Sequence, residues 1–198
     1  EFSSLLDEDP QDERARYFLA SSYEEKKLYP RAIEEFEKIP ETSELYGDTL
    51  IHIAAILKKQ GKPEQAIALI KDGISRKEDE PELYSYLGSL YQDDKLFKEA
   101  EEITRKGLEL FPDSPDLHYR MGAIYEGTNR FAESIREMEE VLKIDPNNAD
   151  ALNFIGYSYA DRGINLDKAE ELIKRAVKLK PKSGYIIDSL GWLYFRQD

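Results

Sequence analysis

Apolar residues recur along this chain at helical spacing, in pairs of segments separated by short polar breaks. Residues 81–114 show the pattern most clearly. Their first apolar stripe falls at positions i, i+4, i+7 and i+8, on Leu83, Leu87, Leu90 and Tyr91. The polar run 93–95 interrupts it, and a second stripe begins at Phe97 and continues until Pro112 stops it. Both stripes are typical of amphipathic helices, so the segment predicts a helix–turn–helix unit.

A small residue returns every 34 positions inside the first stripe of each pair. The series is Ala20, Ala54, Gly88, Gly122 and Gly156, then Gly191 after one inserted residue. A glycine inside a helix costs about 1 kcal/mol relative to alanine, so we expect close contact with a neighbouring helix to outweigh that cost. A period of this length indicates stacked supersecondary units.

The period divides the chain into one continuous array, 1–198, with five full units. These units are 13–46, 47–80, 81–114, 115–148 and 149–183, preceded by the end of another unit at 1–12 and followed by the first helix of a further unit at 184–198. Because both ends look like cuts through a unit, we expect the chain to be a piece of a longer array. Two local departures are expected: Pro40 shortens the second helix of 13–46, and a longer first helix follows it. Around 163–165 an insertion lengthens the turn, with Asn165 as the N-cap.

The spacing resembles the tetratricopeptide repeat, whose signature is W-x₂-L-G-x₂-Y…A-x₃-F…P. Residues 81–114 match it at Tyr84, Leu87, Gly88, Tyr91, Ala100 and Pro112. The resemblance covers essentially the whole chain. It implies an all-α fold, an α-solenoid in which helix–turn–helix repeats wind into a right-handed superhelix. The segments GYSYADRGINLDKAEELI and SLGWLYF also look like those of bacterial cell-envelope and lipoprotein-type arrays of this family.

The resemblance further implies that the first helix of each unit lines a concave groove that binds a peptide or protein segment. The candidate binding residues are Tyr17, Phe18, His52, Tyr86, Tyr119, Arg120, Asn153, Phe154, Tyr157 and Trp192. The resemblance places Asp188 and Ser189 in the same groove as Trp192. Independently of the family, aromatic side chains off the apolar stripe tend to mark interaction surfaces. The alternative is that several of these rings pack between adjacent first helices as core.

Charge and composition argue against several classes of function. The chain has 41 acidic and 28 basic residues and a formal net charge of −13, which disfavours nucleic acid as a partner. It has no cysteine and two histidines, without metal-ligand spacing, and no motif for nucleotide binding or hydrolysis. No apolar run approaches the ~20 residues of a membrane span. We therefore expect no cofactor, no metal and no enzymatic activity.

These observations predict a non-catalytic protein–protein interaction scaffold that assembles a larger complex. One alternative is a structural array that self-associates through its ends, where an acidic start and a mildly basic finish can order copies. Another is a helper domain of a larger envelope, secretion or export protein. The expected location is the bacterial periplasm or outer membrane, with the cytoplasm as the alternative.

Overall fold

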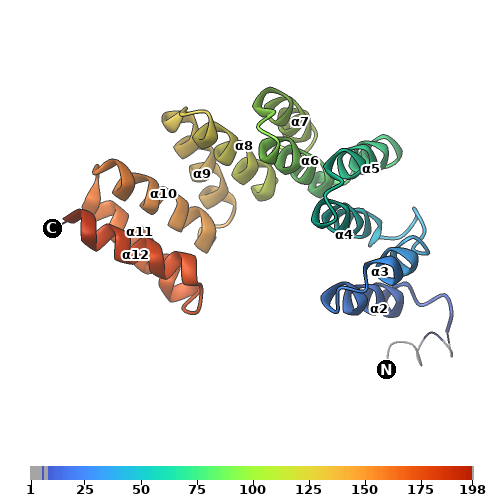
Figure 1. Ribbon diagram of the computed structural model, residues 1–198. Coiled ribbons are helices and arrows are strands. Elements are labelled where there is room, and N and C mark those ends of the chain that lie inside the picture. Colours follow the sequence, from blue (N-terminus) through green and yellow to red (C-terminus); the bar gives the residue numbers. More distant parts are fainter. Residues whose placement is uncertain (1–5, 7–8, 198) are drawn as a thin grey trace. The chain divides into compact units, whose positions relative to one another are not determined.

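The computed structural model describes residue 6 and residues 9–197 of the chain. Over these residues it is built from helices α2 to α12, joined by short turns, and contains no strand (Figure 1). The fold is an all-α solenoid of helix–turn–helix pairs, as the sequence predicts. The first helices of the pairs are α2 (Glu13–Glu25), α4 (Tyr46–Lys59), α6 (Pro81–Asp93), α8 (Pro115–Gly127), α10 (Ala149–Arg162) and α12 (Gly184–Gln197). The second helices are α3 (Tyr29–Phe36), α5 (Pro63–Arg76), α7 (Phe97–Leu110), α9 (Phe131–Ile144) and α11 (Leu166–Leu179).

The chain divides into two compact units, residues 1–110 and 111–198. The first unit contains α2 to α7 and the second contains α8 to α12. Each is described below by itself. The division does not test the expectation of one continuous solenoid over 1–198, which stays a prediction.

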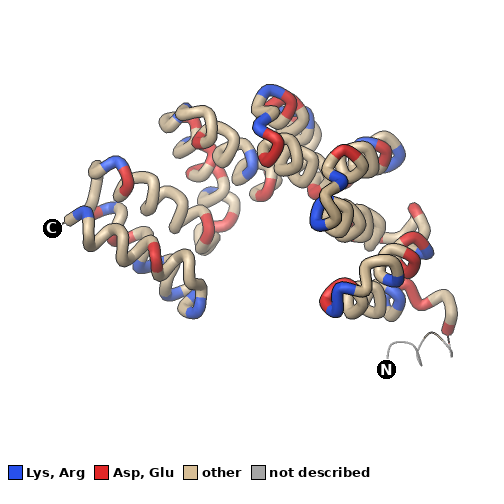
Figure 2. Tube along the Cα trace, viewed as in Figure 1, with Lys and Arg blue, Asp and Glu red and all other residues tan. Residues whose placement is uncertain are grey.

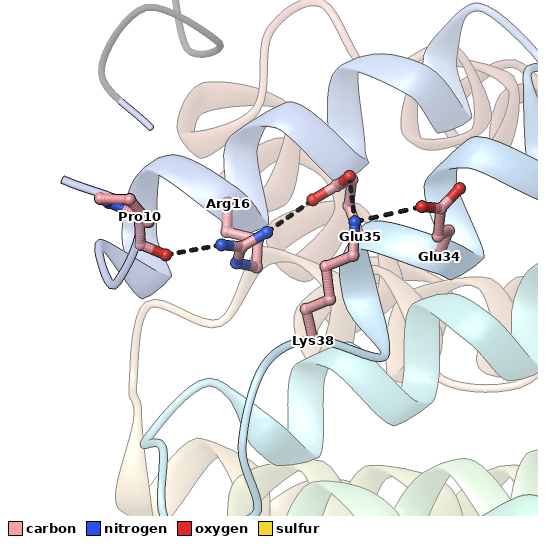
Figure 3. Close-up of polar contacts among 5 residues, drawn as sticks. All are labelled: Pro10, Arg16, Glu34, Glu35 and Lys38. Atoms are coloured by element: carbon pink, nitrogen blue, oxygen red, sulfur yellow. Dashed lines mark hydrogen bonds and ion pairs between the residues drawn. The ribbon is translucent and has the colours of Figure 1, made fainter. Parts of the chain in front are cut away.

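In the first unit, α2, α3 and α4 enclose a core cluster. Its buried members are Ala20, Ala32, Phe36, Ile39, Ile53 and Ile56. A network of hydrogen bonds and ion pairs also connects α2 to α3 (Figure 3). Arg16 donates from Nη1 to Glu35 Oε2 at 2.7 Å and from Nη2 to the Pro10 carbonyl at 2.6 Å, while Lys38 Nζ lies 2.7 Å from Glu35 Oε1. Because the Arg16 and Glu35 side chains are only 16% and 15% exposed, water screens this pair less than an ordinary surface ion pair.

In the second unit, the close approach of paired helices depends on glycine. A Cβ at Gly122 of α8 would lie 2.7 Å from Met138 Cε and 3.2 Å from the Ser134 carbonyl oxygen of α9. A Cβ at Gly156 of α10 would lie 2.6 Å from Ile173 Cγ1 on α11. The predicted helix–helix contact is confirmed at both positions, since an added Cβ would displace the Met138 or Ile173 side chain and crowd a carbonyl oxygen of the neighbouring helix.

Two local predictions hold only in part. α3 does end early, at Phe36, but α4 begins only at Tyr46 and has 14 residues, as many as the first helices α10 and α12. The expected longer first helix is wrong because the turn before α4 is closed by its own hydrogen bonds, from Ser43 N to the Pro40 carbonyl and from Tyr46 N to the Ser43 carbonyl.

Asn165 does occupy the N-cap position of α11, but it has a left-handed backbone with φ 49° and its side chain makes no capping hydrogen bond. The predicted N-cap position is therefore confirmed, but the side-chain hydrogen bond usual at that position is absent. Asparagine tolerates this conformation, which lets the inserted residue turn the chain directly after Gly163, itself at φ 67°.

Candidate functional site

Helices α10 and α11 differ in where they carry charge (Figure 2). α10 has no Lys, Arg, Asp or Glu between Asp150 and Asp161, whereas α11 has charged residues in every turn. Long charged side chains on a helix face are usually solvated. A face that carries polar uncharged and aromatic residues in their place is better suited to contact another protein.

A pocket of about 490 Å³ lies between α10 and α12, entirely within the second unit. We call it the α10–α12 pocket. It is lined by Asn153 and Tyr157 of α10 and by Tyr185, Asp188, Ser189 and Trp192 of α12. Three of the predicted site residues, Asn153, Tyr157 and Trp192, therefore come together here.

Two polar atoms of this pocket's lining residues are buried without a partner. Asn153 is 7% exposed, and its Oδ1 accepts no hydrogen bond from any described residue. Trp192 Nε1 is likewise buried and unpaired within the described part of the chain. Buried polar groups are nearly always hydrogen-bonded, and each exception calls for an explanation. A ligand that supplies the missing partners is one such explanation.

The carboxylates of Asp150 and Asp188 near the pocket differ in whether they have a hydrogen-bond partner. Asp150 accepts from Lys180 Nζ at 2.8 and 2.9 Å and from the Tyr185 hydroxyl. Burial by itself would raise the pKa of Asp150, but these hydrogen bonds outweigh it and lower the pKa. Asp188 is exposed and has no ion-pair or hydrogen-bond partner among residues 6 and 9–197. Only Asp188 therefore offers an uncompensated negative charge to a ligand.

Further predicted residues lie beside the pocket on α8 and α10. The rings of Tyr119 and Phe154 meet edge to face, with centroids 5.9 Å apart. Both pack against the buried cluster of the second unit, and burial raises the pKa of Tyr119, with the charge of Asp150 adding to it. Arg120 is half-buried. These side chains are partly core, while Tyr157, at 43% exposed, is open to solvent.

In the first unit, two predicted residues are engaged in an internal network. The Tyr17 hydroxyl lies 2.9 Å from His52 Nε2, and His52 Nδ1 lies 2.6 Å from Glu24 Oε2. Lys59 donates to the other oxygen of Glu24 at 2.8 Å. Burial would raise the pKa of Glu24, but the hydrogen bonds from Lys59 and His52 reverse the effect and lower it. A second pocket, of about 410 Å³, is lined in part by Glu24, His52 and Lys59.

The remaining two predicted residues of the first unit are Phe18, whose ring meets that of Tyr17 edge to face with centroids 5.9 Å apart, and Tyr86. Phe18 is 52% exposed. Tyr86 on α6 is half-buried, and burial raises its pKa, with Asp93 adding to the shift. The first unit thus pairs Tyr17 with His52, and the polar groups of this network hydrogen-bond to one another.

A third pocket, in the first unit, has a more highly charged lining. It measures about 570 Å³ and lies among α5, α6 and α7, with charged side chains such as Glu99, Glu102 and Glu109 in its lining. Within it, Lys71 Nζ lies 5.6 Å from the centroid of the Tyr91 ring. We favour the α10–α12 pocket as the site because it contains an unpaired buried polar side chain.

Sequence reasoning missed Tyr185. Its position in the sequence could have identified it. Tyr185 precedes Asp188 by three residues and Ser189 by four, which places it on the same side of one helix as both. It was overlooked because it stands at the second residue of α12.

Among the described residues, no group of three or more His, Cys, Asp or Glu is arranged to hold a metal ion. Within the same residues, no helix is long and apolar enough to cross a membrane.

Comparison with known proteins begins with the sequence. Two family models, both described as tetratricopeptide repeat, match residues 91–156 and residues 1–44. A stretch of 50 residues is 50% identical to the TPR repeat-containing protein PA4667 of Pseudomonas aeruginosa. That stretch is 25% of this chain and 8% of the relative, so the match spans less than a tenth of the relative's length.

Solved structures resemble the whole fold. TTC0263, a thermophilic TPR protein in Thermus thermophilus, has a TM-score of 0.74 at 16% identity, over 92% of this chain and 99% of that one. YrrB, described as a TPR protein with an unusual peptide-binding site, has a TM-score of 0.58 at 17% identity, over 95% and 96%. MamA has a TM-score of 0.61 at 22% identity, over 82% and 95%. At these identities the likeness shows the fold alone.

Proposed function

Because this chain belongs to the tetratricopeptide-repeat proteins, we propose that it binds a peptide segment of another protein along its first helices and so assembles a larger complex. The repeat is in general a fold for protein–protein interaction, and its members are generally non-catalytic. The finer proposal is that the α10–α12 pocket is the principal contact for the bound segment.

The unpaired buried oxygen of Asn153 is the observation that carries this proposal. A peptide provides N–H donors along its length, so a bound segment supplies the partner that the folded chain lacks. Tyr157 and Trp192 beside it offer large ring area with little loss of side-chain entropy. The peptide-binding site named for YrrB lends support from a protein of the same fold.

The test is selection of peptides from a random phage-displayed library on the folded chain. The selected peptides are then measured against Tyr157→Ala and against Tyr194→Ala. Both tyrosines are similarly exposed, at 43% and 44%, but only Tyr157 lines the pocket. We expect Tyr157→Ala to weaken binding by about tenfold or more and Tyr194→Ala to leave it unchanged, with the same far-UV helix signal in both. Equal losses in the two variants would refute binding at this pocket.

One observation favours a second candidate, self-association of the chain. α12 has an apolar face that the described residues leave open, with Ile187, Tyr194 and Phe195 exposed, the last at 69%. A contiguous exposed apolar face often marks an interface. Light scattering at high protein concentration decides this candidate: a dimer or larger species that Phe195→Glu dissociates supports it, and a monomer at every concentration excludes it.

We also propose the bacterial cell envelope as the location. This proposal rests only on the resemblance of the segments 156–173 and 189–195 to envelope proteins of the family. Fractionation of the source cells, with an antibody against this chain, tests it: recovery with the cytoplasmic markers would contradict an envelope location.

A further inference from the structure

We infer that the α10–α12 pocket binds a cationic side chain, Lys or Arg, of the partner segment. The inference rests on the proposed function, because it names the residue type that the peptide presents to this pocket. Four properties of the lining residues carry it.

The first property is aromatic. Tyr157, Tyr185 and Trp192 make up half of the lining residues. The faces of such rings carry partial negative charge and attract ammonium and guanidinium groups. The unit already uses this interaction internally, since the guanidinium carbon of Arg162 lies 4.2 Å from the ring centroid of Phe131.

The second property is negative charge. Among the described residues, Asp188 is the only charged one that lines the pocket, and it is exposed. Charge complementarity across an interface selects partners and speeds their association. A cation on the peptide would meet both the carboxylate and the ring faces, whereas an acidic side chain would be repelled.

The third property is a set of acceptors that need donors. Asn153 Oδ1 accepts no hydrogen bond within the described chain, and Ser189 Oγ, which donates to the Tyr185 carbonyl at 2.9 Å, keeps its capacity to accept. The Asp188 carboxylate completes the set. Lys and Arg side chains are donors only, which makes them its chemical complement. The unpaired Nε1 of Trp192 is a donor, and it is buried.

The fourth property is that the pocket contains no cationic side chain from the described chain. Lys180 is paired with Asp150. Arg196 lies with its guanidinium carbon 5.8 Å from the centroid of Trp192 and donates to the Asp161 carbonyl, and it does not line the pocket. No Lys, Arg or His is among the lining residues, so the charge of Asp188 is left for a ligand to compensate.

The test uses Trp192, the single tryptophan of the chain, as a reporter within the pocket. The probes are four pentapeptides, Ac-Gly-Ser-X-Ser-Gly-NH₂, in which X is arginine, lysine, norleucine or glutamate. Each is titrated into the ¹⁵N-labelled full chain while the indole N–H resonance is followed. We expect the arginine and lysine peptides to shift this resonance in a saturable way, and the norleucine and glutamate peptides to bind at least about tenfold more weakly.

A pair of matched variants tests whether the charge of Asp188 is responsible for the binding of the cationic peptides. Asp188→Asn should weaken binding of the arginine and lysine peptides by about tenfold while hardly changing side-chain size. Glu171→Gln removes the same charge from an exposed position on α11 that does not line the pocket, and it should leave binding unchanged.

Several outcomes overturn the inference without touching the proposed function. Equal binding of all four peptides would mean that the pocket recognises main chain alone. Unchanged binding in Asp188→Asn, or no shift of the Trp192 resonance with any peptide, would mean that no cation binds there. The proposed function fails separately, if library-selected peptides are indifferent to Tyr157→Ala.

Discussion

His118 is held by two acceptors at once. Its Nδ1 lies 2.7 Å from Glu137 Oε2 and its Nε2 lies 2.9 Å from the Pro112 carbonyl oxygen. A neutral imidazole has one N–H and can donate only one of these bonds, whereas the imidazolium donates both. The hydrogen bond with Glu137 is the main cause that raises the pKa of His118, and burial opposes it only in part.

The raised pKa predicts a pH-dependent contribution to stability. The folded state holds the proton of His118 more tightly than the unfolded state, so the stabilisation is fully present below the unfolded pKa and is lost as pH rises through the folded pKa. His118→Gln should therefore lower the free energy of unfolding more at about pH 5 than at about pH 8.5. Urea unfolding at the two pH values measures this. Glu137→Gln should flatten the same dependence, and an equal loss at both pH values would show that His118 acts by packing alone.

At the scale of the helices, the glycines of α10 and α12 occupy equivalent places with opposite surroundings. A Cβ at Gly156 would lie 2.6 Å from Ile173 Cγ1 and 3.1 Å from the Ala169 carbonyl oxygen. At Gly191, the corresponding residue of α12, a Cβ would meet no described atom within 4 Å. Glycine therefore lies at a tight helix–helix contact in α10 and on an open helix face in α12.

This difference predicts opposite signs for the same substitution. Gly156→Ala should destabilise the chain by about 1–3 kcal/mol, because the carbonyl of α11 cannot move aside cheaply. Gly191→Ala should stabilise it by up to about 1 kcal/mol, because alanine has the higher helix propensity and has space here. Unfolding midpoints of the two variants against the parent chain measure both effects. A destabilising Gly191→Ala would mean that this face of α12 is covered in solution.

At the scale of the molecule, the second unit has a core of its own. The buried residues of one hydrophobic cluster in this unit run from Ile135 to Leu193 and lie on α9 to α12. Helices of repeat proteins contact mainly their neighbours, so stability is close to a sum of local terms. A unit that contains several neighbouring pairs can then fold without the rest.

We therefore predict that residues 111–198 fold when expressed alone. The fragment should show a helical far-UV spectrum and cooperative thermal unfolding, with a smaller urea m-value than the full chain because less surface is exposed on unfolding. Circular dichroism during a thermal and a urea titration measures these properties. A fragment that is largely unfolded at low temperature would show that the first unit is required for the second.

The sequence pattern alone predicts the helix pairs, their period and the small residues at the α8–α9 and α10–α11 contacts. These features are local: hydrophobic spacing within a helix and a polar break between helices do not depend on distant parts of the chain. Gly122 and Gly156 lie where the period placed them. The departures from prediction are the start of α4 and the missing side-chain cap at Asn165. Both fall in turns, where a few hydrogen bonds and one left-handed residue decide the path of the chain.

Only the tertiary structure decided which of the predicted aromatics are open and which are partly core. Tyr157 and Phe154 are three residues apart on α10, yet one is exposed and the other packs against Tyr119. The tertiary structure also brings Asn153 and Trp192, from helices in successive repeats, into one pocket, and leaves Asn153 Oδ1 unpaired. Such facts depend on distances between helices, which hydrophobic periodicity alone does not contain.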